Sequence, residues 1–160
     1  MAHAAGACGM VGGQVLDLQA EQSQTRSAAA KSAHDDFVAL EDVHARKTGA
    51  LIRAATGAGA IMAGADADTC RAIDEYAREL GLCFQIVDDI LDVDGSAAEL
   101  GKSAGKDAAS GKLTYPALHG LERSRELAET CATRARAALD SAGLAGHLPA
   151  ILDWTLTRRR

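Results

Sequence analysis

Residues 84–92 read Phe-Gln-Ile-Val-Asp-Asp-Ile-Leu-Asp and stand near the end of a long apolar pattern. Its apolar residues recur at helical spacing, at Ile73, Tyr76, Ala77, Leu80, Phe84, Val87 and Leu91. This period predicts one helix from Cys70 to about Val93, which Gly95 ends. On such a helix Asp88 and Asp92 lie one turn apart on the same side, with Gln85 one turn earlier. The stretch therefore predicts a helix that carries Asp88 and Asp92 on one side, with Asp89 flanking them.

The three carboxylates of this stretch repel one another unless a cation lies among them. Magnesium prefers oxygen ligands, and it usually takes one or two carboxylates together with waters and phosphate oxygens. A helix that displays Asp-Asp-x-x-Asp is thus suited to holding a metal-bound diphosphate. The alternative is a solvated acidic helix end, and the motif by itself does not decide between the two.

The rest of the chain also has helical periodicity. An apolar, Gly-rich helix is expected at Ala4–Leu18, where Gly9, Gly12 and Gly13 allow close packing on a neighbour. Asp35 or Asp36 is expected to cap a helix that continues to Ile61 with a kink at Thr48-Gly49. Further helices are expected after an Asp68 or Thr69 cap, from Thr114-Tyr115-Pro116, and at Glu122–Ala142 and Leu148–Thr157.

Two polar stretches, Gln19–Asp35 and Gly101–Gly111, are expected to be loops. Strand-like alternation is absent from the sequence, so residues 1–160 are predicted to form one all-α domain.

Bulk properties narrow the function classes. The 160 residues are 48% hydrophobic with a mean hydropathy of -0.05, and no apolar stretch approaches the length of a membrane span. A net charge of -5 argues against a nucleic-acid partner. The four cysteines form no Cys-x-x-Cys pair, which favours buried, reduced thiols in a cytoplasmic protein.

Basic residues occur at two places suited to a polyanion. Arg46-Lys47-Thr48-Gly49 lies at the expected kink, and a Gly-rich loop at residues 101–116 carries three lysines. Lysines in such a loop can reach a diphosphate while glycine lets the backbone approach. The loop is not a Walker motif, and each lysine taken separately is more readily a solvated surface residue.

Four segments in this order, at residues 9–18, 44–53, 84–92 and 101–116, closely resemble the C-terminal half of bacterial farnesyl and geranylgeranyl diphosphate synthases. These are trans-type members of the polyprenyl diphosphate synthase family. The resemblance covers nearly the whole chain and is weakest over Gln19–Asp35. It implies an isoprenoid-synthase-type helical bundle, here truncated to about its C-terminal half.

The resemblance also implies roles for individual residues. Asp88 would ligate Mg²⁺ on an allylic diphosphate, and Asp89 and Asp92 would act on that ion through its waters. Lys47 and Lys102 would contact the allylic diphosphate, and Lys112 would add positive charge. The remaining implied pocket residues are Gln14, Asp17, Thr48, Gln85 and Asp107, the last of which would steady the lysine loop. The basic tail Arg158–Arg160 resembles the family's tail over the homoallylic diphosphate, although a frayed end is an equal alternative.

The implied reaction joins isopentenyl diphosphate to an allylic diphosphate. Mg²⁺ and lysines stabilise the departing diphosphate, the isopentenyl double bond attacks the allylic carbocation, and a proton is then lost. This chemistry needs no protein nucleophile, so His44 is expected to be structural and the other four histidines to lie at the surface. The full-length form is expected to be a homodimer.

The sequence departs from the family in one respect. Family members carry a first Asp-rich motif and an isopentenyl site upstream of the segment that matches residues 9–18, whereas Asp-Asp-x-x-Asp occurs here once. Three interpretations follow: a truncated enzyme, a noncatalytic or regulatory partner of a full-length synthase, or a helical module without the chemistry. The intact lysine and aspartate motifs argue against the third, and we favour the first.

Overall fold

The computed structural model describes residues 1–24, 33–99 and 113–158, and every regular element in these ranges is a helix. This confirms the all-α prediction. The elements are α1 (Ala2–Ala5), α2 (Met10–Gln24), α3 (Ala33–His44), a π-helical turn η1 (Ala45–Gly49), α4 (Ala50–Met62), α5 (Ala67–Glu99), α6 (Tyr115–His119), α7 (Leu121–Ser141) and α8 (His147–Thr157). Within these ranges no helix combines the length and the apolar character that a membrane crossing requires.

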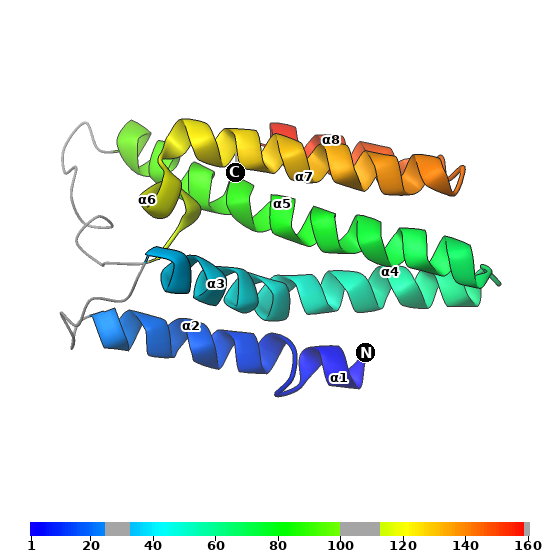
Figure 1. The fold of residues 1–160 in the computed structure, drawn as a ribbon, viewed down its shortest axis with the longest axis horizontal. Helices are drawn as coiled ribbons and strands as arrows, with labels where there is room; N and C mark the ends of the chain where they lie inside the picture. Colours follow the sequence, from blue (N-terminus) through cyan, green and yellow to red (C-terminus); the bar gives the residue numbers. More distant parts are fainter. Residues whose placement is uncertain (25–32, 100–112, 159–160) are drawn as a thin grey trace.

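The long helices lie side by side along a common axis (Figure 1). Helix α2 forms one edge, α3 and α4 follow each other end to end, and α5 lies between them and the α7–α8 pair. Helix α5 therefore occupies the centre, with neighbours on both sides.

The core lies chiefly between α5 and α7. Tyr76, Cys83 and Ile86 on α5 are almost completely buried. Helix α7 faces them with mostly small residues, namely Ala128, Cys131, Ala132, Ala135 and Leu139. Small side chains let the two helices approach closely, and burying a residue such as Ile86 contributes about 1.5–3 kcal/mol.

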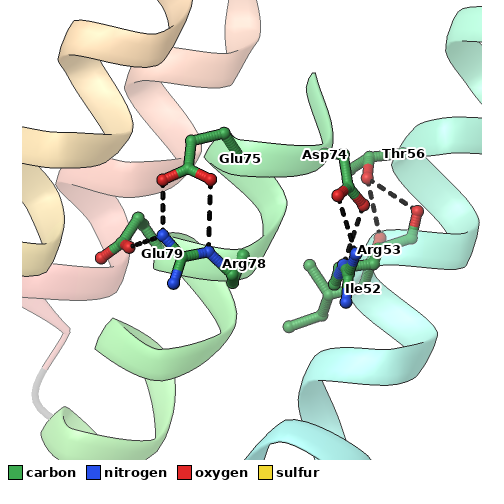
Figure 2. A network of polar contacts seen from close by, with 7 residues as sticks. All are labelled: Ile52, Arg53, Thr56, Asp74, Glu75, Arg78 and Glu79. Atoms are coloured by element: carbon green, nitrogen blue, oxygen red, sulfur yellow. Dashed lines mark hydrogen bonds and ion pairs between the residues drawn. The ribbon is translucent and has the colours of Figure 1, made fainter. Parts of the chain in front are cut away.

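Polar contacts join α4 to α5 at the other side of the central helix (Figure 2). Arg53 donates to both carboxylate oxygens of Asp74, at 2.8 and 2.7 Å. This hydrogen bond lowers the pKa of Asp74 and raises that of Arg53. Because both side chains are about half exposed, the pair adds at most about 1 kcal/mol.

The boundaries of α5 differ from those expected. The Thr69 backbone N–H donates to Asp66 Oδ1 at 2.8 Å, so Asp66, rather than Asp68 or Thr69, caps the helix. The helix also continues past Gly95 to Glu99. A single interior glycine costs only about 1 kcal/mol, which the packing of a long helix can offset.

The first third of the chain also departs from expectation. The helix expected at Ala4–Leu18 is two helices, α1 and α2, and α2 runs on to Gln24 into the expected loop. Helix α3 starts at Ala33, so Asp35 and Asp36 lie in its first turn rather than at its cap. Carboxylates are favourable there because they face the positive end of the helix dipole.

The expectations for the C-terminal third are confirmed. Helix α6 starts at Tyr115 and is capped by Thr114, whose side chain accepts a hydrogen bond from the Ala117 N–H at 3.3 Å. Helices α7 and α8 each start one residue before the expected position.

Candidate functional site

The π-helical turn η1 contains Arg46, Lys47 and Thr48. The expected kink at Thr48-Gly49 coincides with this turn: the chain passes from α3 to α4 through π-helical residues, and both flanking residues, His44 and Ala50, keep right-handed helical dihedrals. A π-turn accommodates an extra residue within a helix and is frequent at functional sites. It changes the direction in which the side chains of the turn project.

Helix α2 packs directly against this turn at Gly13. A Cβ atom placed on Gly13 would lie 2.7 Å from Lys47 Cα, which only glycine avoids. One turn further along α2, Asp17 Oδ2 accepts a hydrogen bond from Lys47 Nζ at 2.5 Å. Both side chains are largely buried, with 31% of Lys47 and 16% of Asp17 exposed. The lysine is thus held at a fixed place against α2.

Helix α5 contacts the same turn from another side. A Cβ atom on Gly81 would lie 3.1 Å from Gly49 Cα, so the two backbones are nearly in contact. Gly81 precedes Gln85 by one helical turn and Asp88 by two. The turn with Lys47 and the acidic stretch of α5 therefore belong to neighbouring elements.

The three aspartates of the Asp-Asp-x-x-Asp stretch on α5 lie in different surroundings. Asp92 is exposed, the Asp88 side chain is half exposed, and Asp89 is buried. Asp89 Oδ2 accepts a hydrogen bond from the Tyr115 N–H at 3.0 Å, which joins α5 to the start of α6. Asp88 and Asp92 are consequently the more accessible pair.

Asp88 also has a cationic neighbour from the end of the chain. Arg158 Nη2 lies 2.9 Å from Asp88 Oδ1 and 3.1 Å from the Phe84 carbonyl oxygen. Sequence reasoning assigned the tail to a diphosphate or to solvent, and it did not foresee this contact.

The remaining predicted residues are only partly described. Gln14 is exposed on α2, and Thr48 and Gln85 are partly buried. Lys102, Asp107 and Lys112 lie outside the described residues, as do Arg159 and Arg160.

The donor chemistry of α5 fits magnesium. In the described part of the chain no three His, Cys, Asp or Glu side chains gather closely enough to hold a metal by themselves. Asp88 and Asp92 offer accessible carboxylate oxygens one turn apart, and magnesium characteristically combines one or two carboxylates with waters and phosphate oxygens. The residues present thus fit an ion that arrives with a diphosphate.

The histidines and thiols are not among the residues assigned to the metal or the diphosphate. His44 is buried and stacks on Tyr115 with ring centroids 5.7 Å apart, in keeping with its predicted structural place. His3, His119 and His147 are exposed, as expected, and the His34 side chain is not in the described part. The thiol prediction was half right: Cys83 and Cys131 are buried, whereas Cys8 is exposed and Cys70 is partly so.

The fold and these contacts define an all-helical protein in which an aspartate-bearing helix packs beside a lysine-bearing π-turn. Residues 3–142 match the family model described as Polyprenyl synthetase. The chain belongs to this family.

Named relatives agree with this membership. Geranylgeranyl pyrophosphate synthase 3, chloroplastic, of Arabidopsis thaliana is 47% identical over 129 residues, which are 81% of this chain and 34% of the relative. The farnesyl diphosphate synthase of Escherichia coli is 47% identical over 140 residues, 87% of this chain and 44% of the relative. A crystal structure of an FPP/GFPP synthase from Zymomonas mobilis superposes with a TM-score of 0.71 at 32% identity, over 96% of this chain and 46% of that one. The chain therefore spans a third to a half of the length of these relatives.

Proposed function

We propose that this chain forms the part of a short-chain prenyl diphosphate synthase, of farnesyl or geranylgeranyl type, that binds the allylic diphosphate. The whole enzyme would condense isopentenyl diphosphate with an allylic diphosphate. The observation that carries the proposal is the family match over residues 3–142, which includes Asp17, Lys47 and Asp88 on elements that pack together.

In this proposal Lys47 binds the diphosphate through its ammonium group. Asp17 holds the lysine against α2, and the turn that carries Lys47 packs against α5 at Gly49 and Gly81. A fixed positive charge stabilises the negative charge that develops on a departing diphosphate without reorganisation at that moment. The family resemblance also implies a place around the same group for Lys102, Lys112, Gln14, Thr48, Gln85 and Asp107.

Asp88 would ligate Mg²⁺, and Asp89 and Asp92 stay predicted to act on the ion through its waters. When bound, the ion would neutralise diphosphate charge. The hydrogen bond from the Tyr115 N–H supports a further structural task for Asp89, which is to fix the start of α6 on α5.

We also propose that the full-length form is a homodimer in which α2 lies at or near an interface. Val11, Val15 and Leu18 are each about half exposed and recur at positions i, i+4 and i+7 along α2. Such a stripe is typical of a helix that packs on a partner.

The alternative is a noncatalytic or regulatory partner of a full-length synthase. Its supporting observation is the share of the relatives that the chain covers, 34% for the plant enzyme and 44% for the bacterial one. The two candidates differ in whether the same polypeptide also supplies the isopentenyl site.

Binding of inorganic pyrophosphate with Mg²⁺, measured by calorimetry on the 160-residue chain, tests the proposal. We expect Asp88→Ala and Lys47→Ala each to weaken binding by about tenfold or more, since each removes a charge-assisted contact. Asp140→Ala, which removes an exposed carboxylate from α7, serves as the control and should stay within about twofold. Equal losses in all three variants would contradict the assignment.

A further inference from the structure

We propose that Arg158 is a positioning residue for Asp88. It holds one oxygen of this carboxylate and leaves the other available to a cation that carries a diphosphate. This inference rests on the proposed function, because it deepens the site in which Asp88 takes part.

The Arg158 guanidinium contacts one turn of α5 through three separate interactions. Nη2 lies 2.9 Å from Asp88 Oδ1 and donates to the Phe84 carbonyl oxygen at 3.1 Å. The guanidinium carbon lies 4.1 Å from the centroid of the Phe84 ring. The Arg158 side chain is only 8% exposed, and its Nε is buried without a hydrogen-bond partner.

The two contacts with Phe84 and the backbone of α8 hold the guanidinium without help from Asp88. The Arg158 backbone N–H donates to the Trp154 carbonyl oxygen at 2.9 Å, so the residue is tied to the end of α8. Helix α8 in turn packs on α5 and α7 and buries Leu152 and Thr155. The Phe84 ring and carbonyl would keep the arginine in place while Asp88 changes its ligands.

The geometry favours positioning over blocking. The arginine contacts Asp88 at Oδ1, and the Asp88 side chain remains 50% exposed. A carboxylate can accept hydrogen bonds or bind a metal through both oxygens at once. Restricting Asp88 to one rotamer removes an entropic cost that would otherwise fall on metal binding. The positive charge beside it also favours the incoming diphosphate.

The test compares Arg158→Gln, Arg158→Lys and Arg136→Gln in binding of Mg²⁺ with inorganic pyrophosphate. Arg136 is the matched control, since its Nη2 pairs with Asp153 Oδ1 at 2.6 Å and joins α7 to the same helix α8. We expect Arg158→Gln to weaken binding by about tenfold, with partial recovery in Arg158→Lys and no change in Arg136→Gln. Binding by Arg158→Gln that equals or exceeds that of the unaltered chain would overturn the proposal and make the arginine a competitor of the cation.

A second measurement needs no ligand. Three-bond NMR couplings of the Asp88 side chain report its χ1 rotamer, which should be single in the unaltered chain and in Arg136→Gln but averaged in Arg158→Gln. Unchanged couplings in Arg158→Gln would overturn the positioning role. If the unaltered chain bound no pyrophosphate, that result would count against the proposed function, and the couplings would still decide the role of Arg158.

Discussion

Two buried thiols, Cys83 on α5 and Cys131 on α7, lie in the core between these helices. Burial raises the pKa of each to about 12, with smaller contributions from nearby carboxylates, Glu129 for Cys83 and Glu79 for Cys131. Both thiols are therefore neutral at physiological pH and act as small apolar groups in the α5–α7 interface.

The raised pKa values of these two thiols predict that the folded protein loses stability at alkaline pH. In the unfolded chain they lose their protons near the ordinary value of 9.0, whereas the folded chain retains them up to about 12. The unfolded state thus binds fewer protons above pH 9, and the free energy of unfolding falls by up to about 1.4 kcal/mol per pH unit for each thiol. Urea titrations across this pH window should give a shallower fall in Cys83→Ala/Cys131→Ala. The same slope in both proteins would contradict the predicted cause.

Single residues of the candidate site stay predictions, and a local motif names some of them. The Asp-Asp-x-x-Asp stretch and Arg-Lys-Thr-Gly pointed to Asp88 and Lys47 without any knowledge of the fold. Their partners were harder to find, because Asp17 lies 30 positions from Lys47 and Arg158 lies 70 positions from Asp88. Only the packing of α2 on η1 and of α8 on α5 brings these charges together.

At the scale of elements, the contact between α2 and η1 depends on one missing side chain. Gly13→Ala would place a methyl group against the backbone of Lys47, where neither helix can yield by a rotamer change. We expect the variant to lose about 1–3 kcal/mol of stability in urea denaturation, as overpacked sites do. It should also weaken binding of pyrophosphate with Mg²⁺, since the turn that carries Lys47 would move away from Asp17.

Gly59 on α4 provides the control for this prediction. A Cβ atom there meets no atom within 4 Å. The main effect of Gly59→Ala is therefore to reduce the conformational entropy of the unfolded chain. It should raise stability by about 0.5–1 kcal/mol. If Gly13→Ala behaved in the same way, close approach at Gly13 would not be what holds η1 on α2.

The elements themselves were largely predictable from apolar periodicity, which placed α5, α7 and α8 within a few residues. Apolar periodicity did not predict two features. The π-turn at Ala45–Gly49 lies where α2 and α5 both approach closely, and periodicity alone indicated an irregularity there but not its π-helical form. The extension of α5 to Glu99 overrides the local preference of Gly95, because a long helix propagates more easily than it starts.

At the scale of the whole molecule, the chain carries one Asp-Asp-x-x-Asp motif and spans a third to a half of its relatives. We expect the 160-residue chain alone to form no C10–C20 product from radiolabelled isopentenyl diphosphate and an allylic diphosphate.

A fusion of this chain to the part of the Escherichia coli relative that it does not cover should form product. Asp88→Ala in that fusion should lower the rate by about 100-fold or more, the scale of losing a main electrostatic contact. Product from the chain alone would contradict the first expectation.

The apolar stripe of α2 has a consequence for assembly. Helix α2 lies at the edge of the described helices (Figure 1), and its residues Val11, Val15 and Leu18 are each about half exposed. Burial contributes about 25 cal/mol per Å² of apolar area, so covering several hundred Å² would add several kcal/mol, comparable to the stability of a small domain. The chain should therefore self-associate at micromolar concentration in sedimentation velocity experiments.

Substitutions on the stripe test whether α2 is the contact. Val15→Gln/Leu18→Gln should shift the sedimentation profile toward the monomer, because a polar amide in the interface would lose water without a matched partner. Ile151→Gln, on the exposed side of α8, is the control and should leave the association unchanged. The thermal midpoint should depend on protein concentration in the unaltered chain and lose that dependence in the α2 variant, since association stabilises only the folded form. A monomer whose sharp melting is independent of concentration would show that α2 needs no partner.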